Sequence, residues 1–146
     1  MFQTYKIIPF KKEHLEVMEI RQHEAQFLNE GLLDYLQSGV AFTGVADGRV
    51  ISCGGLNIMG HDNADVWQIP SIYVDSVSIS YARYVRKWVQ DMKEAFALNR
   101  METLCVDDGL HKRWMRFLGF QQEGVKRNYI DGQDYVLWGR IWTDGN

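Results

Sequence analysis

Residues 107–120 read DDGLHKRWMRFLGF and have the pattern of a short amphipathic helix followed by a strand. Apolar or aromatic side chains recur along one broad face of that helix: His111, Trp114, Met115, Phe117 and Leu118. The basic side chains fall on the other face, toward water: Lys112, Arg113 and Arg116. Gly119 can adopt the left-handed conformation that ends a helix without a Cβ clash, and Phe120 then begins a strand over the same core.

The composition of the chain indicates one globular domain without a bulk attraction to polyanions. Its 146 residues can bury enough apolar surface for stability, so we expect a single domain over residues 1–146. The net charge of −3 does not favour nucleic acid or an anionic membrane, and no apolar run is long enough to cross a bilayer. We therefore expect a cytoplasmic protein. Nucleic-acid binding would require one basic surface made of Lys112, Arg113, Arg116, Lys126 and Arg127.

The two cysteines show no metal-binding or redox spacing. Cys53 and Cys105 each lie inside an apolar run, far apart in the sequence. We expect both to be buried free thiols in a reducing compartment rather than partners in a disulfide.

The first half of the chain predicts a strand, two short helices and two further strands. The expected ranges are Phe2 to Pro9 for the strand, Lys11 to Arg21 and Phe27 to Ser38 for the helices, and Val40 to Val45 and Val50 to Ile58 for the later strands. Asp47-Gly48 predicts an antiparallel hairpin, because both turn positions tolerate positive φ. Gly54 and Gly55 indicate either a bulge or a place where another backbone or a ligand comes close.

The second half predicts a disturbed strand, a long helix and three further strands around the helix described above. The expected ranges are Ala64 to Asp75 with a disturbance at Pro70, the helix from Ile79 to Leu98, Met101 to Val106, Phe120 to Tyr129, and Tyr135 to Trp142. The buried stripe of the long helix is expected to contain Tyr81, Val85, Trp88, Val89, Met92 and Phe96. Asp131-Gly132 predicts a second hairpin turn.

The resulting order is β-α-α-β-β-β-α-β-α-β-β, which belongs to the α/β (α+β) class. Tight turns require antiparallel neighbours, whereas the strand-helix-strand unit around the long helix requires a crossover. A mixed, mostly antiparallel sheet with helices on both faces satisfies both requirements.

This order, together with the segment His111 to Phe120, resembles the GNAT superfamily of acyl-CoA-dependent N-acyltransferases over nearly the whole chain. With Gly54-Gly55-Leu56-Asn57, it looks most like a short phage-encoded branch that includes internal virion proteins of podophages. The resemblance implies a GNAT-like fold, acetyl-CoA as co-substrate and an amine as acceptor.

In the superfamily, backbone N–H groups at the start of the long helix hold the CoA pyrophosphate, through a Gln/Arg-x-x-Gly-x-Gly/Ala signature. The matching positions are Val77, Ser80 and Ala82, so the cation and the first glycine are missing. The resemblance places the cofactor contacts at Tyr73, Val74, Ser78, Ser80, Tyr81, Ala82, Arg86 and Trp114. Alternatively, Ser78 or Ser80 only caps the helix.

Three cations occupy the early turns of the long helix, where the helix dipole disfavours positive charge. They are Arg83, Arg86 and Lys87. A nearby anion would explain their position, and so would a solvated helix face.

The resemblance also indicates where catalytic groups would stand. The tyrosine that often protonates the leaving thiolate is replaced by Met115, so another acid is needed. His111 is the candidate acid or base, or else a capping or packing residue. Asp65 is the best match for a general base and Asp75 a poorer one, although both suit strand ends or turns. Cys105 could serve as a nucleophile, but direct transfer to an amine needs none.

Two hypotheses follow from the sequence. In the first, the chain is an N-acetyltransferase that presents acetyl-CoA, bound between the fourth and fifth strands, to an amine. In the second, it is a GNAT-fold phage protein without catalytic activity that contacts other phage proteins during virion assembly or within the particle. The protein would then be found in the host cytoplasm or in the virion.

Overall fold

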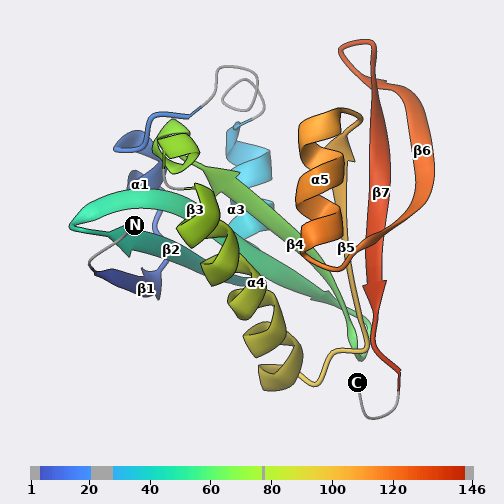
Figure 1. The fold of residues 1–146 in the computed structure, drawn as a ribbon, viewed down its shortest axis with the longest axis horizontal. Helices are drawn as coiled ribbons and strands as arrows, with labels where there is room; N and C mark the ends of the chain where they lie inside the picture. Colours follow the sequence, from blue (N-terminus) through green and yellow to red (C-terminus); the bar gives the residue numbers. More distant parts are fainter. Residues whose placement is uncertain (1–3, 21–27, 77, 144–146) are drawn as a thin grey trace. The chain divides into compact units, whose positions relative to one another are not determined.

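The computed structural model describes residues 4–20, 28–76 and 78–143 (Figure 1). In chain order the elements are β1 (Tyr5–Pro9), α1 (Glu13–Glu16), α3 (Glu30–Ser38), β2 (Val40–Ala46), β3 (Arg49–Met59), β4 (Asn63–Pro70), the 3-10 helix η1 (Ile72–Ser76), α4 (Ser78–Ala95), β5 (Arg100–Val106), α5 (Gly109–Phe117), β6 (Gln121–Ile130) and β7 (Gln133–Ile141). Within the described residues, the order of strands and α-helices expected from the sequence is confirmed, and η1 is an addition to it.

The strands form one mixed sheet in the order β1-β2-β3-β4-β5-β7-β6. The β1–β2, β2–β3, β5–β7 and β6–β7 pairs are antiparallel. The β4–β5 pair is parallel, and its ladder joins Asn63 to Arg100, Ala64 to Met101 and Asp65 to Glu102. The mixed, mostly antiparallel sheet predicted from the sequence is therefore confirmed.

The chain divides into two compact units, and both β4 and α4 contribute to each of them. The first unit contains Met1–Asn57 and Val66–Tyr84, and the second contains Ile58–Asp65 and Val85–Asn146.

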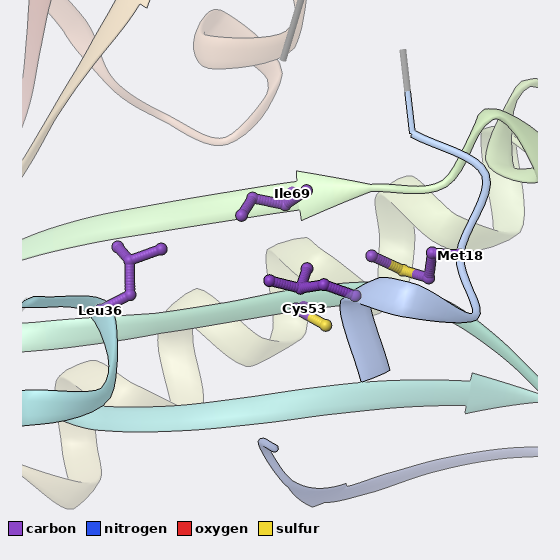
Figure 2. Packing of buried hydrophobic residues seen from close by; sticks show 5 residues of the cluster. Met18, Leu36, Cys53 and Ile69 are labelled. Carbon is purple, nitrogen blue, oxygen red and sulfur yellow. The ribbon is translucent and has the colours of Figure 1, made fainter. Parts of the chain in front are cut away.

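In the first unit, helices cover both faces of the sheet. On one face, Leu15 and Met18 pack with Leu36 of α3 against Cys53 of β3 and Ile69 of β4 (Figure 2). Successive side chains of a strand point to opposite faces, so Ser52 points away from this cluster. On that second face the phenol of Tyr81, from α4, hydrogen-bonds Ser52 and accepts a hydrogen bond from Nε2 of Gln68.

In the second unit, α5 covers a face made by β5 and β7. Met115 and Leu118 of α5 are buried with Met101, Val136 and Trp138 of the two strands. Asp108 caps the helix by accepting a hydrogen bond from the N–H of His111 at 2.7 Å.

The end of α5 is closed as the sequence predicts. Gly119 has a φ of +88°. The N–H of Phe120 donates to the carbonyl of Met115 at 2.9 Å, and the N–H of Gly119 donates to the carbonyl of Arg116 at 3.0 Å. These two hydrogen bonds around a left-handed residue define a Schellman motif. Both Asp-Gly hairpin turns are also confirmed, because all four of their residues have positive φ.

The two consecutive glycines of β3 are explained by a close backbone and not by a bulge at their own position. Gly54 and Gly55 pair regularly with β2, whose register shifts instead between Gly44 and Val45. A Cβ at Gly55 would lie 2.3 Å from the carbonyl oxygen of Val40. Of the alternatives left open by the sequence, the close approach of another backbone is therefore correct.

The strand expected to run to Asp75 ends instead at Pro70. The N–H of Ser71 still donates to the carbonyl of Ile51 at 2.7 Å, but its hydroxyl accepts from the N–H of Tyr73 at 3.1 Å. Such a local hydrogen bond from a serine favours a turn, and η1 follows.

Both predicted N-terminal helices begin later or end earlier than expected. Within the described residues of the first, only Glu13–Glu16 is α-helical, and Arg21 lies outside those residues. The second helix starts at Glu30, because Asn29 caps it by accepting from the N–H of Leu32 at 2.9 Å. Phe2 and Phe27, the expected starts of the first strand and the second helix, lie outside the described residues.

The long helix ends at Ala95 and not at Leu98. Ala97 takes φ of +51° and the N–H of Leu98 donates to the carbonyl of Lys93 at 2.9 Å, so this end resembles that of α5 without a glycine. As a result Phe96 falls outside the helix and is 37% exposed, in contrast to its predicted place in the buried stripe. Tyr81 and Val89 of that stripe are buried.

Ala97→Gly is expected to stabilise the protein by about 0.5–1 kcal/mol. The substitution relieves the cost of an L-residue in the left-handed region, and this gain exceeds the added entropy of a glycine in the unfolded chain. Urea unfolding followed by tryptophan fluorescence measures the change. An unchanged or lower free energy of unfolding would contradict the assigned helix end.

Gly119→Ala is expected to destabilise the protein by about 1–2 kcal/mol, because alanine must keep a left-handed backbone there. Its Cβ would also lie 2.9 Å from Nη1 of Arg140, which would have to move. The same unfolding measurement tests this substitution. Gly124→Ala is a suitable control, since no heavy atom lies within 4 Å of a Cβ built there.

Candidate functional site

The segment between β4 and α4 contains the first of the predicted cofactor contacts. The guanidinium carbon of Arg49 lies 4.4 Å from the ring centroid of Tyr73. Val74 is buried, and its N–H donates to the carbonyl of Ser71 at 3.1 Å. Val77, the first position of the expected phosphate signature, lies outside the described residues, and α4 begins at Ser78. A cofactor contact at these residues stays a prediction.

The first turn of α4 combines partly exposed and buried positions. Ser80 and Ala82 are half-buried, whereas Tyr81 is only 3% exposed. Burial raises the pKa of the Tyr81 phenol above its ordinary value, although its hydrogen bonds with Ser52 and Gln68 act in the opposite direction. The side chain of Tyr81 thus holds α4 to the sheet of the first unit, and only its backbone remains for a ligand.

In the second unit, Phe117 brings two predicted cofactor residues together. The guanidinium carbon of Arg86 lies 5.1 Å from the ring centroid of Phe117. The ring of Trp114 stacks on the ring of Phe117, with centroids 6.3 Å apart and an angle of 20° between the ring planes. Arg86 makes no ion pair with any described residue, whereas Lys87 pairs with Asp91 at 2.7 Å. The solvated-face interpretation therefore fits Lys87, and Arg86 has an aromatic partner instead.

Arg140 adjoins this group, and the sequence analysis missed it. Its Nη1 donates to the carbonyl of Leu118 at 2.8 Å, and its guanidinium carbon lies 4.5 Å from the ring centroid of Trp142. Burial first, and then the positive charge of Arg86, lower the pKa of Arg140. A signal was present in the sequence: Arg140 lies between Trp138 and Trp142 at a spacing of two, which places a cation on the inward face of the last strand.

The start of α5 positions His111. Nδ1 of His111 lies 2.7 Å from Oδ1 of Asp108, the same oxygen that accepts the backbone N–H of His111. A carboxylate hydrogen-bonded to Nδ1 fixes the ring and directs Nε2 away from the carboxylate. Asp108 is thus the capping residue. His111 has the oriented ring that acid-base chemistry requires, and its catalytic role stays a prediction.

The remaining catalytic candidates differ in their surroundings. Asp65 is half-buried opposite Glu102 in the parallel ladder, and Asp75 is exposed in η1. Met115 is 3% exposed and has no proton to donate. Cys53 and Cys105 are both free thiols; Cys53 is buried as expected, whereas Cys105 is half-buried. Burial raises the pKa of the Cys105 thiol to about 12, which makes it a poor nucleophile near neutral pH.

The five basic residues that nucleic-acid binding would require do not share one surface. Lys112 of α5 pairs with Asp107 at 3.3 Å. Lys126 pairs with Tyr135 in the β6–β7 ladder, and Tyr135 lies five residues before Arg140, which contacts α5. Because side chains alternate along a strand, Lys126 is on the face opposite α5.

Two further findings concern the described residues. None of their helices combines the length and the apolar character needed to span a bilayer. Their His, Cys, Asp and Glu side chains also form no group of three that could bind a metal ion.

The sequence matches no family model and no curated protein, but the fold resembles solved acetyltransferases. Ard1 from Thermoplasma volcanium aligns at a TM-score of 0.79 and 14% identity, over 96% of this chain and 99% of that one. The ribosomal-protein-S5-alanine acetyltransferase from Vibrio fischeri aligns at 0.69 and 18%, over 100% and 97%. A GNAT family acetyltransferase from Elizabethkingia anophelis, with acetyl-CoA bound, aligns at 0.71 and 11%, over 96% and 99%. The chain therefore has the GNAT fold.

The stability of the protein is expected to fall as the pH rises above about 9. Burial raises the pKa of the Cys53 thiol to about 11 and that of Cys105 to about 12, so the unfolded chain loses these protons first. The stabilisation that the two thiols give below pH 9 is then lost, and the free energy of unfolding falls by on the order of 2 kcal/mol between pH 8 and 10. Urea unfolding at both pH values tests this expectation. The loss should be smaller in Cys105→Ala, and equal losses in both proteins would contradict it.

Proposed function

We propose that this protein is an N-acetyltransferase that transfers the acetyl group of acetyl-CoA to an amine. The observation that carries the proposal is the GNAT fold over almost the full chain, shared with an acetyltransferase that has acetyl-CoA bound. Fold likeness alone does not establish chemistry, so the local arrangement of α4 and α5 provides the second line of support.

The start of α4 offers a place for the cofactor phosphates. The first N–H groups of a helix have no partner within the helix, and they carry the positive end of its dipole. These N–H groups support phosphate binding although the glycines of the superfamily signature are absent.

The transfer requires two proton movements. The amine nitrogen attacks the thioester carbonyl carbon, the C–N bond forms, and the C–S bond breaks with its electron pair going to sulfur. The amine loses one proton and the thiolate gains one. His111, held by Asp108 through Nδ1, can exchange a proton at Nε2, and Asp65 is the alternative acceptor of the amine proton. The remaining rate enhancement would come from positioning the amine against the thioester, and from a backbone N–H of β4 that polarises the thioester carbonyl.

Isothermal titration of the purified protein with acetyl-CoA tests the first part of the proposal. Binding with a dissociation constant in the micromolar range is expected, as for typical substrates. The absence of heat at millimolar acetyl-CoA would overturn the proposal. A screen of amines, with released CoA thiol as the readout, would then identify the acceptor.

His111→Gln is expected to lower kcat by roughly 10²- to 10⁴-fold, because it removes the acid-base group and keeps a polar side chain. The dissociation constant of acetyl-CoA should not change. His61→Gln, an exposed histidine in the turn between β3 and β4, is the matched control and should retain full activity. If His111→Gln were fully active, the acid-base role would be assigned to Asp65 instead, and Asp65→Asn would be the corresponding test.

A second candidate function has one specific observation in its favour. Met115 is buried at the position where the superfamily often has its acid, so the chain lacks that proton donor. In this alternative the protein has lost catalysis and acts in a phage particle or its assembly. Mass spectrometry of purified phage particles would detect the chain there, and its absence from the particles would remove the virion role.

A further inference from the structure

We propose that Arg86 and Arg140 form a binding site for a phosphomonoester dianion. The class includes free phosphate and the 3′-phosphate of CoA. Only the assignment to CoA rests on the proposed function, because the site itself is built from residues of the second unit alone.

The first argument is that two like charges are held together without an acid. Arg86 lies over Phe117 and Arg140 donates to the carbonyl of the next residue, Leu118, so both guanidinium groups lie at the C-terminal end of α5. Neither of them forms an ion pair with a described residue. Two acidic groups of this sheet have another arginine as their partner: Arg100 binds Glu123 at 2.6 Å and Glu102 at 3.3 Å. Glu123 lies over Gly139, which neighbours Arg140 in β7, so its carboxylate is on the opposite face of the sheet. A dianion would remove the repulsion that remains between the two guanidinium groups.

The second argument is that both guanidinium groups are held in place by aromatic rings. Arg86 lies over Phe117 and Arg140 over Trp142, at 5.1 Å and 4.5 Å from the ring centroids. Stacking leaves the edge of a guanidinium free to donate, and its fixed fork matches the oxygens of a phosphate. Because the groups are already ordered, little conformational entropy is lost when an anion binds.

The third argument comes from counting donors. A guanidinium has five N–H groups, and Arg140 uses Nη1 for the carbonyl of Leu118. The other N–H groups of Arg140, and all those of Arg86, make no hydrogen bond to a described residue. Capping of α5 therefore explains one donor of Arg140, but it does not explain why Arg86 is held beside it.

Titrations with CoA, 3′-dephospho-CoA and inorganic phosphate test the proposal. We expect the wild-type protein to bind CoA at least about tenfold more tightly than 3′-dephospho-CoA, as charge-assisted hydrogen bonds would give. In Arg86→Gln and in Arg140→Lys the ratio should fall toward one, while the affinity for 3′-dephospho-CoA stays unchanged. Arg140→Lys keeps a cation that can cap α5, but it lacks the planar set of guanidinium donors that can bind a phosphate with two hydrogen bonds. Arg127→Gln, an exposed arginine of β6, is the matched control.

Thermal unfolding with and without millimolar phosphate separates the two sources of the ligand. If CoA and 3′-dephospho-CoA bind equally, but phosphate raises the Tm of the wild type and not of the two variants, the site takes a free phosphomonoester. If neither CoA form binds, the proposed function fails while the phosphate measurement still decides on the site. A preference for CoA that persists in both variants would overturn the proposal, and so would the absence of both a preference and a phosphate effect in the wild type.

Discussion

The left-handed backbone of Gly119 is the constraint on which the second unit depends. It lets the N–H of Phe120 return to Met115, which ends α5 and sets the start of β6. Because Gly119 has no side chain, the guanidinium of Arg140 can lie above it and donate to the carbonyl of Leu118. The helix end therefore fixes one arginine of the proposed anion site, and Phe117 in the last turn of α5 holds the other.

The first unit depends on the alternation of side chains in β3. Cys53 faces α1 and α3, and Ser52 faces α4. A buried hydroxyl group on each face has a partner: Oγ1 of Thr43 lies 2.6 Å from Nδ1 of His14 and 3.6 Å from Sγ of Cys53, and Tyr81 binds Ser52. Buried hydroxyl groups of this kind fix the helices to the sheet because each would be costly without its partner.

The parts of the fold that the sequence predicts correctly are those decided by neighbouring residues. An Asp-Gly pair or a glycine after an amphipathic helix needs positive φ whatever surrounds it, which is why both hairpins and the end of α5 are confirmed. The end of α4 was not predictable in this way, since Ala97 adopts the same conformation without glycine's advantage. Arg140 was missed because its partners, Leu118 and Arg86, are brought to it only by the β5–β7 register and the packing of α5.

The placement of charge along α5 explains why one carboxylate is enough to orient His111 at the N-terminus, whereas two arginines are needed to bind a dianion at the C-terminus. Asp108 stands at the N-terminus, where the helix dipole favours a negative group, and there it orients His111. The C-terminus carries partial negative charge, which repels an anion. A single guanidinium there would be largely offset by the carbonyl of Leu118 that it caps. With Arg86 added, the local charge remains positive, so a dianion can bind beside a helix end that would otherwise exclude it.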